Sequence, residues 1–167
     1  MVNCRAGGDC NGGNPGGVYE YAYDYGIPDS SCEQYIAHNL GHRCGDIDIC
    51  RDCTWPPPPP GDDGLKACWA VPYKHFYAKD YYSVRGASHM KAEIYKNGPI
   101  SCGIDVTAKF EDYKASDGIY HEKVWFPMIN HELAIVGWGL DEETGTEYWI
   151  GRNSWGTYWG DYGFFKI

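Results

Sequence analysis

Several features of common protein classes are missing from this sequence. No apolar run approaches the roughly 18 residues that a membrane-spanning helix needs, and no basic-then-apolar leader opens the chain. Lys and Arg number only 14 against 23 Asp and Glu, and the net charge of −9 argues against a nucleic-acid partner, because phosphate binding needs clustered basic residues. What remains is a chain of 167 residues, enough to bury a core as one domain or as two lobes of one fold.

Cysteine, in contrast, is abundant. The chain has eight Cys with 22 Gly and 15 Tyr, a composition typical of a disulfide-bonded protein of an oxidising compartment. Six of the cysteines crowd the first third of the chain: Cys4, Cys10, Cys32, Cys44, Cys50 and Cys53. Spacing alone does not give their connectivity.

A zinc site competes with disulfides in this region. Cys44, Cys50 and Cys53 lie near His38 and His42 in the sequence. The Cys spacing is irregular, however, and a second Cys-x2-Cys pair is missing, so disulfides are favoured and no metal or cofactor is expected.

The most informative stretch pairs a histidine with an asparagine. His131 opens an apolar run that ends in Gly-Trp-Gly at 137–139, and Asn153 follows a second apolar run after a turn. A hairpin of these two strands would bring Asn153 beside the imidazole of His131. An Asn oxygen on one ring nitrogen would fix the tautomer and orientation of an imidazole that draws a proton from a thiol. The pattern therefore predicts half of a cysteine-protease site.

Residues 129–139 and 148–156 resemble the His and Asn motifs of papain-like cysteine peptidases. The resemblance implies an α+β fold with two lobes and a catalytic role for His131 and Asn153. It also implies that the backbone carbonyl of Asn130 faces the first residue of the substrate, and that Trp155 covers the Asn–His hydrogen bond and lines the leaving-group side of the cleft.

The Cys-x-Gly-Gly segment at residues 10–13 resembles the part of the papain cleft that pairs with an extended substrate main chain. Gly12 and Gly13 are therefore expected to bind substrate, although composition alone would favour a plain surface turn.

The catalytic Cys of that family is not found at its expected place. It precedes the His by about 130–150 residues, and counting back that far from His131 reaches residue 1 or earlier. The family also has a Gln six residues before its Cys, but six residues after the single Gln34 stands Leu40. Cys68 precedes Trp69 as the family's nucleophile does, yet the residue six before it is Asp62, so Cys68 is predicted to be a half-cystine.

The order and spacing of the cysteines resemble those of the cathepsin X (cathepsin Z) group of this family. The resemblance implies three disulfides: Cys4 with Cys44, Cys32 with Cys50, and Cys53 with Cys68. It further implies that Cys10 pairs with a Cys before Met1 and Cys102 with one after Ile167, so that both are unpaired in this chain.

The chain is expected to comprise two regions of a partial papain-like domain. Residues 1–70 form a Gly- and Cys-rich cleft-wall and disulfide region with a proline insert at 56–60, which is favoured as a surface loop over a ligand for a proline-binding module. Residues 71–167 form the β-rich right-hand lobe, and the helical lobe with the nucleophile is largely missing.

The local patterns predict the following elements: irregular structure over 10–17, helices over 18–25 and 89–96 with Ser88 as the N-cap of the second, strands over 73–84, 100–106, 133–138, 148–152 and 163–167, and a short helix or turn within 110–120.

Two residues depart from the family pattern. Glu132 follows the His where a small apolar residue is usual, and its side chain is expected to point away from the cleft into packing, where an unpaired carboxylate is costly. Gly151 stands where a larger residue is usual and is expected to loosen its strand.

The favoured function is that of a cysteine peptidase of the cathepsin X type, with carboxypeptidase preference, present here as a part that is inactive on its own. The expected partners are peptide or protein substrates, the expected state is a monomer, and the expected location is the lysosome or the extracellular space. The alternative is a secreted homologue without catalysis that binds peptides or proteins in the cleft.

Overall fold

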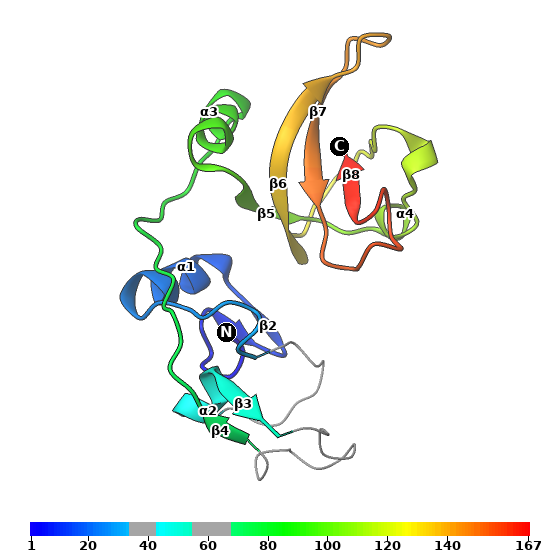
Figure 1. Ribbon diagram of the computed structural model, residues 1–167. Coiled ribbons are helices and arrows are strands. Elements are labelled where there is room, and N and C mark those ends of the chain that lie inside the picture. Colours follow the sequence, from blue (N-terminus) through cyan, green and yellow to red (C-terminus); the bar gives the residue numbers. More distant parts are fainter. Residues whose placement is uncertain (34–42, 55–67) are drawn as a thin grey trace. The chain divides into compact units, whose positions relative to one another are not determined.

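The computed structural model describes residues 1–33, 43–54 and 68–167. The chain forms two compact units, Met1–Tyr82 and Ser83–Ile167, which are described one at a time (Figure 1). The expected division after residue 70 stays a prediction. The proline insert and Gln34, His38, Leu40, His42 and Asp62 lie outside the described residues.

The first unit begins with a short hairpin and a helix. Strand β1 (Gly8–Asp9) pairs with β2 (Gly12–Gly13), and helix α1 (Pro15–Asp24) follows at once. The side chain of Asn14 accepts a hydrogen bond from the Gly16 amide at 2.8 Å, and Pro15 occupies the first helical position. The expectation of irregular structure over 10–17 was therefore wrong, because this cap starts the helix before the predicted residue 18.

Disulfides hold the rest of this unit. The structure contains Cys4–Cys44, Cys32–Cys50 and Cys53–Cys68. The first links the N-terminal segment to the residues before helix α2 (Asp46–Ile49), and the second links Cys32 to the residue after that helix. The third joins the antiparallel strands β3 (Arg51–Cys53) and β4 (Cys68–Ala70) to each other. Because Cys44, Cys50 and Cys53 are all in disulfides, none of them is left as a thiolate for zinc.

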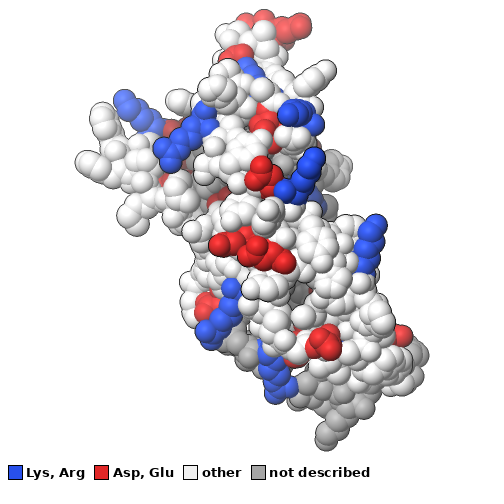
Figure 2. Space-filling view, turned by 90° about the vertical axis from the view of Figure 1, so that its left-hand side faces the viewer, with Lys and Arg blue, Asp and Glu red and all other residues white. Residues whose placement is uncertain are grey.

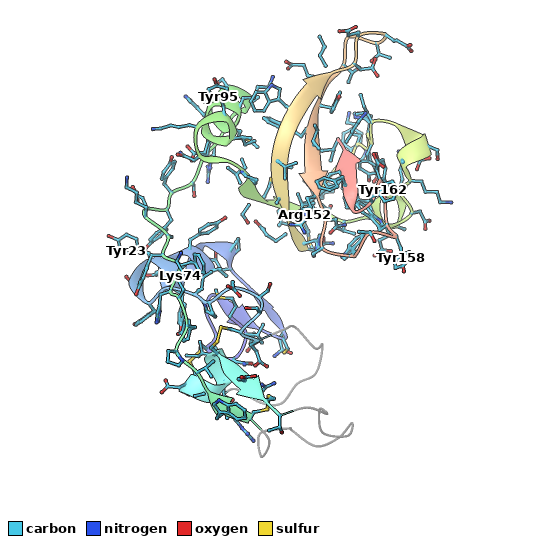
Figure 3. All side chains as sticks on the ribbon, in the orientation of Figure 1. Tyr23, Lys74, Tyr95, Arg152, Tyr158 and Tyr162 are labelled. Atoms are coloured by element: carbon cyan, nitrogen blue, oxygen red, sulfur yellow. A yellow bond between two sulfur atoms is a disulfide. The ribbon has the colours of Figure 1, made fainter. Side chains whose placement is uncertain are left out.

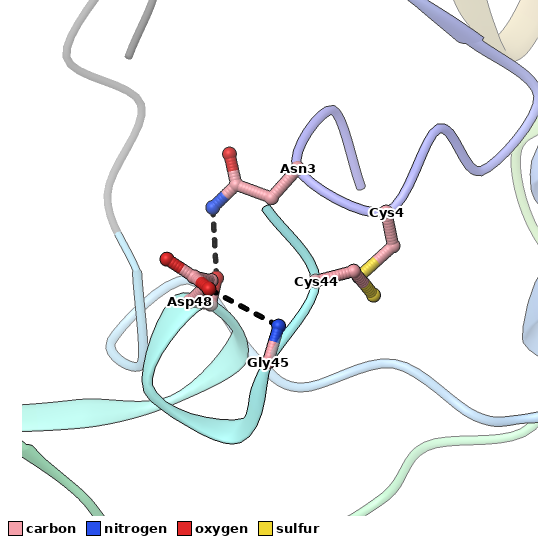
Figure 4. The surroundings of a disulfide bond; sticks show 5 residues. All are labelled: Asn3, Cys4, Cys44, Gly45 and Asp48. Carbon is pink, nitrogen blue, oxygen red and sulfur yellow. Dashed lines mark hydrogen bonds between the residues drawn. A yellow bond between two sulfur atoms is a disulfide. The ribbon is translucent and has the colours of Figure 1, made fainter. Parts of the chain in front are cut away.

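Hydrogen bonds surround the Cys4–Cys44 bridge. The side chain of Asn3 donates to the carbonyl oxygen of Asp48 at 2.7 Å, and the Asp48 carboxylate accepts from the Gly45 amide at 3.1 Å (Figure 4). The bridge and these bonds together fix the start of α2 against the N-terminal segment.

The predicted strand over 73–84 was wrong. In the described residues this segment makes one isolated bridge, between Phe76 and Ile27, and otherwise has no sheet partner. Its alternating aromatics stack on one another instead: the rings of Tyr73 and His75 have centroids 4.4 Å apart, and those of His75 and Tyr77 are 6.0 Å apart. A period of two requires only an extended backbone, which this segment has without a sheet partner.

The second unit is built on one antiparallel sheet in the order β5-β6-β7-β8 (Figure 1). Its strands are β5 (Ile100–Ile104), β6 (His131–Leu140), β7 (Glu147–Arg152) and β8 (Phe164–Lys166), and its helices are α3 (Ala87–Asn97), α4 (Ala108–Glu111) and the 3₁₀ turn η2 (Ala115–Asp117). The predicted strands and helices of this unit were confirmed, except that Gly86 and not Ser88 precedes the first turn of α3.

One face of this sheet carries the core. Residues that lie directly opposite on neighbouring strands share a face, so Cys102, Leu133 and Ile135 point to the same side. The buried cluster on this core face consists of Ile94, Phe110, Tyr113, Leu133, Ile135 and Phe165.

Gly151 belongs to this packing. It pairs with Phe165 on β8, and a Cβ atom at residue 151 would lie 2.1 Å from Cζ of the Phe165 ring. The phenyl ring, which is 1% exposed, therefore lies directly on the glycine. Gly151 does not loosen its strand as expected, because it provides the space that the ring fills.

The alternate residues form what we call the outer face of the sheet. By register it comprises Ser101 and Gly103 of β5, Glu132 and Ala134 of β6, Arg152 of β7 and Phe164 of β8. Arg152, labelled in Figure 3, and Phe164 are exposed, whereas Glu132 is partly buried. This face carries both charged and apolar side chains.

Candidate active site

His131 and Asn153 meet at one end of the sheet of the second unit. His131 is the first residue of β6, and Asn153 follows the last residue of β7, which pairs antiparallel with β6. The imidazole Nε2 of His131 and Oδ1 of Asn153 are 2.8 Å apart. The hairpin thus places the two side chains as the sequence pattern required.

The hydrogen bonds of Asn153 determine the tautomer of His131. Oδ1 of Asn153 also accepts from the backbone amide of Ser154 at 2.8 Å, which assigns the oxygen to the side of the amide that faces the imidazole. Because an amide oxygen can only accept, the proton of a neutral His131 lies on Nε2. The lone pair of Nδ1 is then free to receive a proton.

Trp155 packs against the pair. Its ring centroid is 5.0 Å from that of His131, and it also contacts Phe110 and Trp159 of the core at 6.1 and 5.2 Å. Asn153 is 7% exposed and Trp155 is 38% exposed. Because a hydrogen bond is electrostatically stronger away from water, this setting holds the imidazole in a single orientation.

Asn130 fixes the backbone just before the histidine. Its amide side chain accepts from the Val106 amide at 2.8 Å and donates to the Val106 carbonyl at 3.1 Å, while its own backbone amide donates to the Ile104 carbonyl at 3.1 Å. These three bonds anchor the start of β6. The predicted contact of its carbonyl with substrate stays a prediction.

Gly12 and Gly13 lie in the hairpin of the first unit. Gly12 has φ of +133°, which favours glycine, and a Cβ on it would meet nothing within 4 Å. A Cβ on Gly13 would lie 2.8 Å from the Gly7 carbonyl oxygen, so the hairpin itself requires glycine there. Their predicted role in binding a peptide stays a prediction.

The described thiols lack the features of an activated nucleophile. Cys68 is bonded to Cys53, Cys10 is free and exposed in the first unit, and Cys102 is free and partly buried in the second. Burial, together with the charge of Glu132, raises the pKa of the Cys102 thiol. A catalytic cysteine requires the opposite shift.

The sequence analysis missed the hydrogen bonds of two carboxylates in the second unit. Oγ of Ser101 donates to Oε1 of Glu132 at 2.6 Å, and Oγ1 of Thr107 donates to Oε2 of Glu122 at 2.6 Å. Tyr120 also donates to Glu122. The register of β5 with β6 places Ser101 diagonal to Glu132, and only the structure gives that register. Glu132 therefore has a hydrogen-bond partner and lies on the outer face, not in the core packing that was expected.

Charges of both signs are mixed over the described residues. Figure 2 shows Lys and Arg scattered among Asp and Glu over the face it presents. In the described part of the chain, no group of three or more His, Cys, Asp or Glu could hold a metal ion. Within those residues, too, no helix is long and apolar enough to cross a membrane.

Comparison with known proteins identifies the class. The family model described as papain family cysteine protease matches residues 1–167, so the chain belongs to this family. The predicted family and its α+β fold class are thereby confirmed.

Individual relatives support the same assignment. The chain is 42% identical to cathepsin Z of Onchocerca volvulus over 168 residues and 30% identical to cathepsin C of Schistosoma mansoni over 178 residues, and both matches cover 100% of the chain. Among solved structures, procathepsin B S9 from Trypanosoma congolense and bromelain from Ananas comosus in complex with the E64 inhibitor both superpose with a TM-score of 0.70, at 27% and 25% identity and over 99% of the chain.

The chain spans only part of these relatives. It covers 50% of the cathepsin Z and 35% of the cathepsin C sequence, and 52% and 64% of the two solved chains.

Proposed function

We propose that this chain is the part of a cathepsin Z-type cysteine peptidase that supplies the general base and its orienting amide. The observation that supports this most is the 2.8 Å contact from His131 Nε2 to Asn153 Oδ1 beside the ring of Trp155, which leaves Nδ1 as the proton acceptor. A thiol supplied by a segment beyond these residues completes the site.

In this mechanism Nδ1 of His131 takes the proton of the thiol, and the thiolate attacks the carbonyl carbon of a peptide bond. The tetrahedral intermediate collapses, the C–N bond breaks, and the imidazolium returns the proton to the leaving amine. Water, deprotonated by the same imidazole, then attacks the acyl-enzyme and releases the acid and the thiol. Asn153 holds the ring in place through both proton transfers.

The substrates in this proposal are peptides trimmed at the C-terminus, and the setting is the lysosome or the extracellular space. The identity of 42% with a cathepsin Z supports the first point, and the three disulfides support the second. We expect residues 1–167 alone to be inactive and the enzyme to act as a monomer.

The first test is the intact mass of the protein from its natural source, before and after treatment with a peptidyl epoxide that alkylates papain-type thiolates. A mass well above 18.8 kDa with one added label supports the proposal. A mass near 18.8 kDa without label refutes it and favours the second candidate, a secreted binding module that uses the same cleft without catalysis.

If the label is found, two variants test the roles of the pair. His131→Ala should lower kcat/KM about 10²- to 10⁴-fold, the usual contribution of general acid–base catalysis. Asn153→Ala should lower kcat with little change in KM, since Asn153 orients the base and does not hold the substrate. A carboxypeptidase should in addition hydrolyse a peptide acid much faster than the same peptide amide.

A further inference from the structure

Glu132 directly follows His131, the proposed general base, and only one of its two carboxylate oxygens has a hydrogen-bond partner among the described residues. It lies on the outer face of the sheet, partly buried, and its Oε1 accepts a hydrogen bond from Ser101 at 2.6 Å. In the described part of the chain no ion pair joins it to a Lys or Arg, and no partner is found for its second oxygen. A carboxylate oxygen without a partner can accept a hydrogen bond from a cationic ligand.

The surroundings of the second oxygen suit a particular kind of ligand. Gly103 lies directly opposite Glu132 on β5, and a Cβ there would lie 3.4 Å from Oε2 of Glu132 and 2.6 Å from Cγ2 of Ile129. The carboxylate of Glu132 and the apolar side chain of Ile129 therefore both lie next to Gly103. Ile129 is 67% exposed, so this apolar surface is open on the described chain.

An apolar surface that ends at a carboxylate matches the side chains of Lys and Arg. Their aliphatic stems pack on apolar groups while the charged end binds a carboxylate, and Arg can do so through two parallel hydrogen bonds. We propose that Glu132 is a specificity residue that selects a peptide with a Lys or Arg on the acyl side of the scissile bond. This proposal rests on the proposed peptidase function.

The two faces of the sheet indicate on which side of the scissile bond Glu132 lies. Trp155, expected to line the leaving-group side, packs on the core cluster through Phe110. Glu132 follows His131 on the strand and projects from the opposite face. The two side chains therefore flank His131 from different sides, and Glu132 belongs to the acyl side.

An internal cation is the competing partner. Arg152 lies on the same outer face, diagonal to Glu132 across β6 and β7, because its direct partner is Ala134. It is exposed and makes no ion pair with Glu132 in the structure. A test must therefore separate a substrate role of Glu132 from a structural one.

The experiment compares peptides that contain either arginine or citrulline, its neutral isostere, at each of the residues that precede the scissile bond. The full-length protein is assayed as wild type, as Glu132→Gln, and as the matched control Glu147→Gln, which removes an exposed charge from the far end of the same sheet. Because each ratio is taken within one variant, a loss of folded protein cancels. The same peptides are also titrated into residues 1–167 by calorimetry.

We expect wild type and Glu147→Gln to prefer arginine about ten-fold or more in kcat/KM at one acyl-side position, the usual worth of a hydrogen bond to a charged group. Glu132→Gln should bring that ratio close to one. A ratio near one in the wild type, or a preference that survives Glu132→Gln, overturns the proposal. If neither peptide is hydrolysed and no epoxide label is found, it is the peptidase function that fails. The dissociation constants from calorimetry then test Glu132 separately: a preference for the arginine peptide that Glu132→Gln removes supports its role in recognising a cation, and equal constants refute it.

Discussion

The contact between Gly151 and Phe165 gives a sharp test of how the sheet of the second unit is packed. A methyl group at residue 151 would lie 2.1 Å from Cζ and 2.3 Å from Cε1 of the phenyl ring, far inside van der Waals contact. Phe165 is 1% exposed and cannot swing into solvent without leaving the core. Gly151→Ala should therefore force the ring aside.

Overpacking of this kind costs typically about 1–3 kcal/mol. Taking about 2 kcal/mol, and about 4–8 °C of Tm per kcal/mol for a unit of this size, Gly151→Ala should lower Tm by about 8–16 °C. The measurement is urea and thermal unfolding followed by tryptophan fluorescence and circular dichroism. The matched control is Gly137→Ala on the neighbouring strand, where the new Cβ would lie an ordinary 3.6 Å from Ile150 and the change should cost much less.

A second substitution isolates the contact itself. Phe165→Leu should cost about 1 kcal/mol alone, but it removes the ring atoms that clash, so the double variant should be more stable than the sum of the two changes by about 1 kcal/mol. Equal losses from Gly151→Ala and Gly137→Ala, or strict additivity in the double variant, would show that the ring does not lie on the glycine.

Three further outcomes follow from the structure. Replacing Cys4 and Cys44 by Ser should destabilise the first unit by about 4 kcal/mol, and replacing Cys53 and Cys68 by Ser should destabilise it by about 3 kcal/mol. The separations are 40 and 15 residues, and the unfolded chain gains more entropy when the longer loop is released. The reverse order in urea titrations would contradict this. Cys10 should react with an aromatic disulfide reagent before Cys102, because burial and the charge of Glu132 raise the pKa of the Cys102 thiol. Glu132→Gln should speed the labelling of Cys102, as followed by peptide mass mapping. The hydrogen bonds from Thr107 and Tyr120 lower the pKa of Glu122. Its contribution to stability is therefore present above the ordinary glutamate pKa of about 4.3 and is lost as the pH falls through the lower pKa of the folded state. Glu122→Gln should lack that loss in an acid titration, and an unchanged acid transition would count against these hydrogen bonds.

The sequence was enough to predict the hairpin that carries His131 and Asn153. Both strands have strong apolar patterns, and the turn between them is short, so the pairing is local and needs no other part of the chain. The position of Asn153 beside the imidazole follows directly from that pairing. The chemical roles of the two residues stay predictions.

Features that depend on distant contacts could not be predicted in the same way. Alternating aromatics over 73–84 favour an extended backbone, but nothing local says whether a partner strand exists, and this segment stacks its rings instead. The role of Gly151 depends on β8 lying in register with β7, and the bond between Ser101 and Glu132 depends on the register of β5 with β6. Cap chemistry, not apolar pattern, set the start of α1 at Pro15.

The 22-residue separation of His131 and Asn153 has a consequence for how such a site comes into being. Contacts close in sequence form early and quickly during folding, because little loop entropy is lost in closing them. The imidazole and its amide are thus assembled by one hairpin, before any more distant segment must arrive. The thiol is the part of the proposed site that this hairpin does not supply, so the acid–base half can be assembled and studied independently of the nucleophile.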